Sequence, residues 1–395
     1  MRDDVESGVR THRAEQLLID ATADLSAERV LCTSLGWGQL ALSVARRAAS
    51  AQVACHFLDL HPYEQAMYLA EEEGVQVDWQ CTAEPPAGPF DLAAIPVSRF
   101  GEAELTRDIL QDAYGRLSEG GLLVAAVDNR DDKWLHSEMG KLFTKVTREP
   151  QRTGVVFRGV RRGPLKRKRD FRCEFAFRDG ERLVKAVSRP GVFSHRKLDL
   201  GARALLETIE IRAGDRVVDM GCGSGVVGLA AALRAERVFV QTIDSNARAV
   251  ACAQNGAELN GVEVVAETGD LRSGEAARSG DRPQPGGDGS QPEGDSSRTE
   301  PPAIAASAMR VRLNADGDVP EPGMYDLVVG NPPYYSHFQI AEIFLQAAKR
   351  ALKPGGRVLI VTKKDDWHLA RMPQLFERVE SREVRGYKVV SAVAR

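Results

Sequence analysis

Two short segments of the sequence hold the residues whose types and spacing could do chemistry. Residues 217–225 read Val-Val-Asp-Met-Gly-Cys-Gly-Ser-Gly, an apolar run that breaks into a glycine-rich turn. About a hundred residues later, residues 326–334 read Asp-Leu-Val-Val-Gly-Asn-Pro-Pro-Tyr. A glycine-rich turn can hold a nucleotide-like cofactor, and Asn-Pro-Pro-Tyr at a strand end is suited to gripping a planar NH2 group. Together the segments predict methyl transfer from S-adenosyl-L-methionine to a nitrogen atom.

The glycine-rich turn supplies the first residues expected to bind the cofactor. Glycines between a strand and a helix let the backbone approach a ligand closely and aim free N–H groups at it. The carboxylate directly before the turn suits a cationic sulfonium better than a pyrophosphate. Nicotinamide and flavin enzymes share the Gly-x-Gly-x-Gly pattern, so the turn alone leaves them open. The predicted residues are Asp219, Gly221, Gly223 and Gly225.

Two further carboxylates extend the predicted cofactor site. Asp244 ends the next predicted strand and can accept hydrogen bonds from two ribose hydroxyls, or else cap the helix that starts at Ala247. Asp270 follows the third predicted strand and could accept a hydrogen bond from the adenine amino group. Cys222 is expected to pack inside the turn and not to act as a nucleophile.

Asn331, Pro332, Pro333 and Tyr334 are the predicted catalytic residues. The lone pair of a nucleobase amine or a carboxamide is delocalised, so the enzyme must align the NH2 group with the methyl group. The Asn331 side-chain oxygen and the Pro332 carbonyl could accept its two protons, while the two prolines make the turn rigid. Tyr334 could stack on the planar group. Asn331 is expected to contact the cofactor as well.

Composition sets the class of protein. At 395 residues the chain is long enough for two domains, and its 43% hydrophobic and 28% charged residues are typical of a soluble globular protein. No apolar run reaches the roughly 20 residues that span a bilayer, and the charged N-terminus does not resemble a signal peptide. The six cysteines and seven histidines show no metal-ligand spacing. We therefore expect a cytoplasmic protein, monomeric, without metal or membrane association.

A basic segment interrupts a chain whose net charge is only −3. Residues 145–200 contain 17 Lys and Arg against 6 Asp and Glu, and the densest part is Arg158–Arg172. Such a segment can be a solvated linker. Beside a predicted methyl-transfer domain, it favours contact with the phosphate backbone of a nucleic acid.

The chain contains two copies of one domain. Gly36 and Gly38 align with Gly223 and Gly225 at an offset of 187, and Asp59 aligns with Asp244 at 185. Phe90–Leu92 and Leu117–Gly121 align with Tyr325–Leu327 and Leu352–Gly356 at 235. The first copy has lost the chemistry: Cys32 replaces Asp219, Ser34 replaces Gly221, and Ile95–Val97 replaces Gly330–Pro332. We expect it to be a scaffold or a substrate-recognition domain.

These offsets give the domain organisation. We predict a degenerate domain at 1–160, a basic linker at 161–188 and a catalytic domain at 189–395. The offset grows by 50 between Asp244 and Asp326, which predicts an insertion at about 272–322. Arg272–Pro302 is 16 of 31 Gly, Pro or Ser, so a mobile loop without catalytic residues is expected.

Each copy alternates apolar runs with helical stretches, which predicts an α/β fold with a doubly wound, mostly parallel sheet. In such sheets a ligand binds outside the carboxyl ends of the strands. In the second copy the predicted strands are 216–220, 238–243, 262–266, 325–329, 357–362 and 388–394. The predicted helices are 226–233, 247–259 and 339–352.

Residues 189–395 resemble the bacterial ribosomal RNA guanine-N2 methyltransferases of the small- and large-subunit type. The segments that carry the resemblance are Arg189–Ser194, Leu198–Gly201, Asp219–Gly225, Asn331–Tyr334 and Gly386–Val389. In the first half it rests on the tandem layout and on Val127–Arg130. It implies two Rossmann-like class I methyltransferase domains, the first degenerate, with S-adenosylmethionine as cofactor. Phe193 would help to close the cofactor pocket, and Asn331–Tyr334 would hold guanine N2.

The chain departs from this family at three points. Tyr334 stands where the family usually has Phe, and both the long insertion and the strength of the basic segment are foreign to it. The departures concern the target more than the reaction. Ribosomal RNA, or a ribosomal subunit, is the expected partner.

Other functions share parts of the pattern. Protein glutamine-N5 and adenine-N6 methyltransferases also use Asn-Pro-Pro-Tyr; the basic segment counts against the first, and the lack of a further target-recognition region against the second. A catalytically dead RNA-binding protein is the non-enzymatic alternative. The intact Asp219, glycine turn and Asn331 argue against it, because the first copy shows what a dead copy loses.

Overall fold

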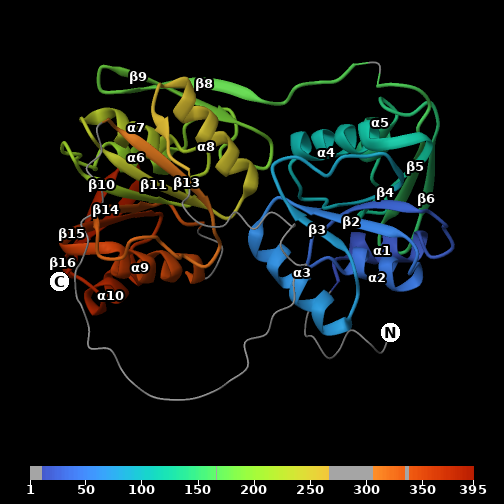
Figure 1. Ribbon diagram of the computed structural model, residues 1–395, viewed down its shortest axis with the longest axis horizontal. Helices are drawn as coiled ribbons and strands as arrows, with labels where there is room; N and C mark the ends of the chain where they lie inside the picture. The colour runs from blue at the N-terminus through green and yellow to red at the C-terminus, as the bar shows by residue number, and fades with distance from the viewer. Residues whose placement is uncertain (1–10, 166, 267–305, 334–337) are drawn as a thin grey trace, which may run out of the picture.

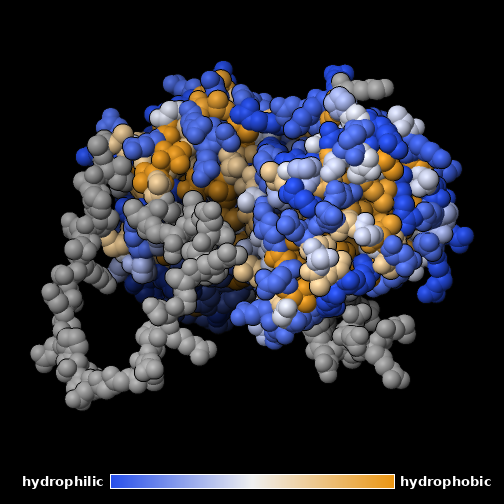
Figure 2. All heavy atoms as spheres, turned by 45° about the vertical axis from the view of Figure 1, so that its right-hand side comes forward, coloured by the Kyte–Doolittle hydropathy of each residue, from blue (hydrophilic) through white to orange (hydrophobic). Residues whose placement is uncertain are grey.

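The structure, a computed structural model, describes residues 11–165, 167–266, 306–333 and 338–395. Its two domains lie side by side, each with a central sheet between layers of helices (Figure 1). Hydrophilic residues cover most of the face shown in Figure 2, with apolar atoms gathered in smaller areas. Residues 1–10, 166, 267–305 and 334–337 lie outside the described part, so Asp270, Tyr334 and the loop predicted at Arg272–Pro302 do as well.

The first domain is built on a seven-stranded sheet in the order β3-β2-β1-β4-β5-β7-β6. The five strands from β3 to β5 are parallel, and β7 and β6 are antiparallel. The strands are β1 (Arg29–Thr33), β2 (Gln52–Phe57), β3 (Asp78–Cys81), β4 (Phe90–Val97), β5 (Leu117–Val127), β6 (Val146–Pro150) and β7 (Val155–Val160). The helices are α1 (Arg13–Ala21), α2 (Gln39–Arg47), α3 (Leu60–Glu73), α4 (Ala103–Arg116) and α5 (Trp134–Met139).

The second domain repeats this topology in an eight-stranded sheet, β12-β13-β11-β10-β14-β15-β17-β16. Its strands are β10 (Arg216–Met220), β11 (Phe239–Asp244), β12 (Glu263–Val264), β13 (Ala308–Leu313), β14 (Tyr325–Gly330), β15 (Leu352–Thr362), β16 (Glu377–Val384) and β17 (Tyr387–Val393). Its helices are α6 (Leu200–Leu206), α7 (Val226–Arg234), α8 (Ala247–Leu259), α9 (Gln339–Ala351), α10 (Asp366–Arg371) and the short η1 (Met372–Gln374). Apart from the edge strand β12, the order matches the first sheet, so the two-copy α/β prediction is confirmed.

The central strands are buried on both faces, which explains why they read as continuous apolar runs. Val217, Val218 and Val328 are fully buried, and they divide between two apolar clusters on opposite faces of the second sheet. The predicted strand 216–220 and the predicted helix 247–259 match β10 and α8 residue for residue.

Two segments of the chain differ from their prediction: part of the predicted linker, and the third strand of the second sheet. Residues 173–188 are not linker but a hairpin, β8 (Cys173–Asp179) and β9 (Arg182–Ser188), whose Phe177 and Val184 are buried in the core of the second domain. Arg182 and Lys185 interrupt the apolar side chains of β9, and Arg178 lies in β8, so the segment reads as a basic run.

The third strand of the second sheet is also misplaced in the prediction. The segment predicted as this strand, 262–266, forms only the two-residue β12 at the sheet edge. The strand beside β11 is β13, which lies inside the insertion predicted at 272–322. Arg310 and Arg312 interrupt its apolar pattern: Arg310 pairs with Glu321 and lies over the ring of Phe239, and Arg312 pairs with Asp318.

The domains contact each other through the carboxyl ends of their sheets. Asp59, after β2, and Asn246, after β11, form an antiparallel bridge. The Ser245 hydroxyl also donates to the Asp59 carboxylate over 2.9 Å. Two backbone hydrogen bonds flank the bridge, Ala247 N to Leu58 O at 2.7 Å and Leu60 N to Ser245 O at 2.8 Å.

Arg248 is the central charged residue of this interface. It lies in the first turn of α8 and is only 1% exposed. Its guanidinium pairs with Asp108 of α4 at 2.7 Å and donates to the carbonyls of Ala83 and Pro190, both at 3.0 Å. A buried guanidinium needs this number of partners, because an unpaired buried charge is costly. The contact fixes α8 of the second domain against α4 of the first.

Candidate functional site

The predicted glycine turn lies between β10 and α7, as the sequence requires. Gly221, Gly223 and Gly225 have φ values of 64°, 54° and 75°, a left-handed conformation that other residues rarely adopt. A Cβ atom at Gly225 would also lie 2.8 Å from the Cβ of Ala253 in α8. Cys222 is buried in the turn and burial raises the pKa of its thiol, which suits a packing role.

Asp219 lies at the end of β10 and is almost completely buried. Its Oδ2 accepts a hydrogen bond of 2.8 Å from the backbone N–H of Gly228 in α7. Burial raises the pKa of its carboxyl to about 7. A carboxylate with so little water around it is well placed to bind a cation at the mouth of the turn.

Asp244 ends β11 and faces the same turn. Its Oδ2 accepts from Gly223 N and its Oδ1 from Asn246 N, both at 2.8 Å. Burial raises the pKa of this carboxyl to about 6. Asp244 does not cap α8: that role belongs to Asn246, whose side chain accepts from the N–H groups of Arg248 and Ala249.

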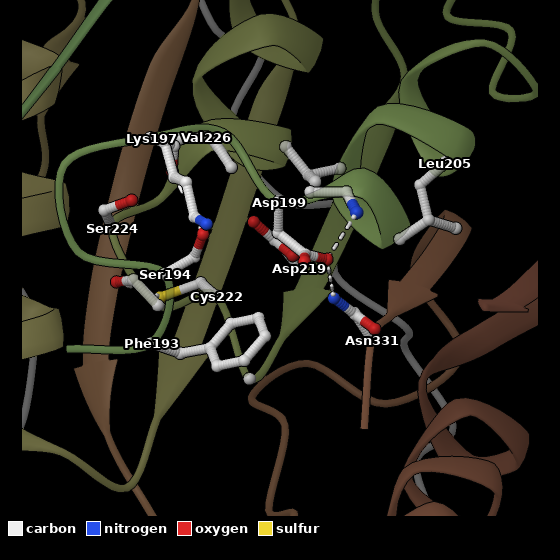
Figure 3. Close-up of a pocket in the computed structure, with 14 residues that line it drawn as sticks. Phe193, Ser194, Lys197, Asp199, Leu205, Asp219, Cys222, Ser224, Val226 and Asn331 are labelled. Atoms are coloured by element: carbon white, nitrogen blue, oxygen red, sulfur yellow. Dashed lines mark hydrogen bonds between the residues drawn. The ribbon is translucent and has the colours of Figure 1, made fainter. Parts of the chain in front are cut away.

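Asn331 follows β14, the neighbour of β10 in the sheet. Its Nδ2 donates to Oδ2 of Asp199 over 3.0 Å. The same oxygen accepts from the N–H groups of Gly201 and Ala202, because Asp199 is the N-cap of α6. The amide is therefore oriented, with its oxygen directed away from Asp199 (Figure 3). Pro332 and Pro333 follow it in the chain, as predicted.

A cavity brings these residues together. Asp219 and Asn331 line it, as do the glycine turn and Phe193 (Figure 3). Asp244 lies behind the turn and does not line it. The residues that sequence reasoning missed are Ser194, Lys197, Asp199, Ala202, Leu205, Ser224, Val226 and Val227. Asp199 left one signal, an Asp directly before a helix, which is common at an N-cap.

The segment 189–197 forms one wall of the cavity, and we call it the strap. Phe193 lies on it with 66% of its surface exposed. The first domain holds the strap through acidic residues in and before α4. The contacts are Gly191 N to Glu102 at 3.0 Å, Arg196 to Glu104 at 3.0 Å, and an ion pair between Arg189 and Glu84.

Asp270 lies outside the described residues, so its predicted contact with the adenine amino group stays a prediction. Because β13 lies beside β11, the loop at this end of the sheet starts at Asn314, whose N–H donates to Asp244 O at 3.0 Å. The Asn314 side chain accepts from Gly317 and Asp318 N–H groups. The insertion separates β13 from β11 in sequence, which hid this loop from the pattern.

In the first domain, a side chain of the same domain occupies the equivalent turn. Glu15 of α1 is fully buried, and its Oε1 accepts from Ser34 Oγ at 2.7 Å and from Leu35 N at 2.6 Å. It also accepts from the N–H groups of Gly36 and Leu40. α1 starts at residue 13 and α6 at residue 200, so the 187 offset aligns Glu15 with Ala202. In the second domain that small residue leaves the cavity open.

The described residues give no support for a metal centre or a membrane span. Within the described ranges, no group of three or more His, Cys, Asp or Glu side chains could hold a metal ion. No described helix is both long and apolar enough to cross a membrane. All six cysteines are free thiols.

Comparison with known proteins gives one family and several relatives. Residues 184–281 and 298–391 match the family described as methyltransferase small domain. The large subunit methyltransferase G of Streptomyces avermitilis is 24% identical over 87% of this chain and 81% of its own length. That of Pseudomonas savastanoi is 26% identical over 93% and 88%. The small subunit methyltransferase C of Pseudoalteromonas atlantica is 43% identical, but over only 20% of this chain and 23% of that protein.

One solved structure resembles the whole chain. It is a 16S rRNA N2 methyltransferase of T. thermophilus in complex with AdoMet and guanosine. The TM-score is 0.71, with 20% identity over 98% of this chain and 94% of that one. At this identity the likeness shows a shared fold across both domains.

Proposed function

We propose that the protein methylates N2 of guanine in ribosomal RNA. Its second half matches the methyltransferase small domain family, and the chain is a class I S-adenosylmethionine-dependent methyltransferase. Two relatives that align over most of this chain are named ribosomal RNA methyltransferases, which supports this target. The substrate would place the activity in the cytoplasm.

One observation carries the proposal: the Asn331 amide is oriented at the edge of the cavity that Asp219 and the glycine turn line. With Nδ2 held by Asp199, Oδ1 is the acceptor that we assign to an N–H group of the substrate. A planar NH2 group matches this acceptor, whereas a hydroxyl or thiol substrate would ask for a base.

The residues of the chain then divide the work as follows. When bound, S-adenosylmethionine supplies a methyl group on a positively charged sulfur. Asp219 provides negative charge close to the turn, and Asp244 fixes the turn through Gly223. The Asn331 oxygen and the Pro332 carbonyl would accept the two amine protons and so align the nitrogen lone pair. Because the nitrogen becomes acidic once alkylated, solvent can take the proton.

Cofactor affinity should rise with pH because two carboxyls of the site have raised pKa values. In the folded protein, Asp219 and Asp244 stay protonated at pH values where the same carboxyls of the unfolded chain, whose pKa values are near 4, have lost their protons. Above their folded pKa values both carboxyls are ionised, and they then destabilise the folded apoprotein most. A bound cation compensates their negative charge in this pH range. We expect the dissociation constant for S-adenosylmethionine to fall by about tenfold between about pH 5.5 and 7.5, with proton release.

Calorimetry in two buffers of different ionisation enthalpy measures both the affinity and the released protons. Asp219→Asn should flatten the dependence near pH 7. A pH-independent affinity in the wild type would contradict the assigned role of these carboxyls.

The basic segment is the part of the molecule proposed to contact the RNA backbone. Not all of its charges are available: Arg158 pairs with Glu149, and Arg161 donates to the Leu117 carbonyl. The segment is tied along α4, where Arg169 N donates to the Gln111 side chain over 2.7 Å. The exposed cations of the described part are Arg162, Arg167, Lys168, Arg169 and Arg172. Two of them are also paired, Lys168 with Asp112 at 3.8 Å and Arg172 with Glu174 at 2.7 Å.

Replacing residues 166–169, Lys-Arg-Lys-Arg, with serines should weaken RNA binding at low salt and flatten its salt dependence. Removing one cation that neutralises a phosphate lowers the slope of log affinity against log salt by about 0.7 to 0.9. Filter binding at several salt concentrations measures both. A Lys349→Ser/Arg382→Ser variant, which removes exposed cations from α9 and β16, is the control. An unchanged slope would leave the segment as a solvated connection.

Transfer of labelled methyl groups tests the proposed function directly. The acceptors are unmodified small-subunit RNA, large-subunit RNA, DNA and release-factor protein. Label recovered as N2-methylguanine from one ribosomal RNA, and lost in Asn331→Ala, is the expected result. Label in protein or in adenine would overturn the guanine assignment, although the methyltransferase would remain.

A further inference from the structure

In the first domain, the loop equivalent to Asn331–Tyr334 has kept its place and changed its chemistry. Ile95–Val97 stands where Gly330–Pro332 stands in the second domain, and β4 ends at Val97. The next residues, Ser98-Arg99-Phe100-Gly101, form a tight turn closed by Gly101 N to Ser98 O at 2.9 Å. This turn lies at the carboxyl edge of the first sheet, the edge that faces the second domain.

The turn displays an aromatic ring and a cation together. Phe100 is 82% exposed, the highest value among the large apolar side chains that the structure places in solvent. The Arg99 guanidinium lies over its ring, 4.6 Å from the centroid. Arg99 is anchored in turn by Asp128, which accepts its N–H at 2.9 Å and lies 3.7 Å from its Nε. The pair is ordered by its own contacts, yet nothing described covers the outer face of the ring.

The position of the turn relates it to the catalytic cavity. Two residues after Phe100, Glu102 accepts the 3.0 Å hydrogen bond from Gly191 of the strap. Two residues after Gly191, Phe193 is the strap's exposed aromatic residue and lines the cavity. Phe100 and Phe193 are thus each two residues along the chain from the same interdomain hydrogen bond, one on each domain.

Exposed cations lie near the turn on both domains. Arg130, two residues after Asp128, is exposed, and so are Arg196 and Lys197 on the strap. The neighbouring carboxylates already have partners, because Glu102 accepts from Gly191 and Glu104 pairs with Arg196. Arg196 is thus itself paired, which leaves Arg130 and Lys197 as exposed cations on this route, with Asp131 exposed next to Arg130.

We propose that Arg99 and Phe100 form a stacking site for an unpaired nucleotide next to the target guanine. The inference rests on the proposed function and gives the degenerate domain a specific role in it. Single strands bind where aromatic side chains stack on bases and cations follow the backbone, and arginine planes stack on bases as well. A base on the free face of Phe100 would extend the stack that Arg99 begins. Phe193 would then be the next aromatic residue on the path to the cavity.

The test uses the full-length protein in two measurements. In methyl transfer to ribosomal RNA, Phe100→Ala should raise the KM for RNA about tenfold, which is typical of the loss of one base–aromatic stack. The kcat and the dissociation constant of S-adenosylmethionine should stay unchanged. Phe100→Tyr keeps a stacking ring and should restore the KM. Tyr68→Ala, which removes another exposed ring of the first domain, is the matched control.

The second measurement follows Phe100→Trp by fluorescence during titration with a short single-stranded oligoribonucleotide. The wild type, with its four tryptophans, gives the baseline. Quenching above this baseline supports the contact; an unchanged KM in Phe100→Ala, without quenching, overturns it. A change of sedimenting mass in Phe100→Ala would also overturn it, because the ring would then belong to a protein interface. If the wild type methylates no RNA, the proposed function fails, and the quenching still decides whether this site binds a base.

Discussion

Asn331→Ala is expected to lower kcat for methyl transfer by about 10² to 10³, while S-adenosylmethionine still binds within a few-fold of the wild-type affinity. The size follows from removing one preorganised hydrogen-bond partner of the reacting group. Asp199 fixes the amide through Nδ2, so the acceptor oxygen is held before the substrate arrives and needs no reorganisation during the reaction.

Asn331→Asp is the sharper companion variant. It keeps an acceptor oxygen at the same place but sets a second carboxylate against Asp199, where the wild type has a donor 3.0 Å from Oδ2. We expect activity as low as in the alanine variant, with partial recovery at low pH as one of the two carboxyls takes up a proton. More than a tenth of the wild-type activity in Asn331→Ala would contradict the assigned role.

Ala202→Glu is expected to weaken S-adenosylmethionine binding by at least about a hundredfold. The reason is the first domain, where Glu15 at the equivalent position occupies the N–H groups of its turn. An introduced glutamate would enter the cavity that Ala202 lines and would meet Asp219 and Asp199 there. The glutamate would reduce the volume of the cavity and add negative charge beside these two carboxylates.

Two controls separate these effects. Ala202→Gln has nearly the same volume without the charge, and Ala202→Ser keeps the residue small, so affinity should fall in the first and persist in the second. Calorimetry gives the affinity and thermal unfolding shows that the variants are folded. Binding by Ala202→Glu within threefold of the wild type would refute the explanation of the closed first copy.

The sequence could predict those features that depend on neighbours in the chain. β10, its glycine turn and α7 follow one another directly, and the aligned offsets revealed the duplication. Glu15 and Asp199 escaped, because each acts on residues far away in sequence: Glu15 on the turn at 34–36, and Asp199 on Asn331. The local pattern around Glu15 does not distinguish it from a surface charge. The position of Asp199 directly before a helix signals an N-cap, but not its contact with Asn331.

The third strand shows a different limit. Strand order is set by pairing in space, and β13 pairs with β11 although about sixty residues separate them. The prediction placed this strand at 262–266 because that is the next apolar stretch along the chain after β11. Asp270, which follows that stretch, lies outside the described residues, so its assignment to the adenine side stays a prediction.

The bridge between Asp59 and Asn246 has a symmetry of its own. Leu60 and Ser245 are equivalent residues of the two copies, and they contact each other through the hydrogen bond of 2.8 Å. Equivalent residues meet in this way only at a two-fold axis, as in an isologous homodimer. At this contact the two copies meet as the halves of an isologous dimer do, each through the carboxyl edge of its sheet. Once fused, one half could lose its own pocket and still remain the obligatory partner of the half that kept it.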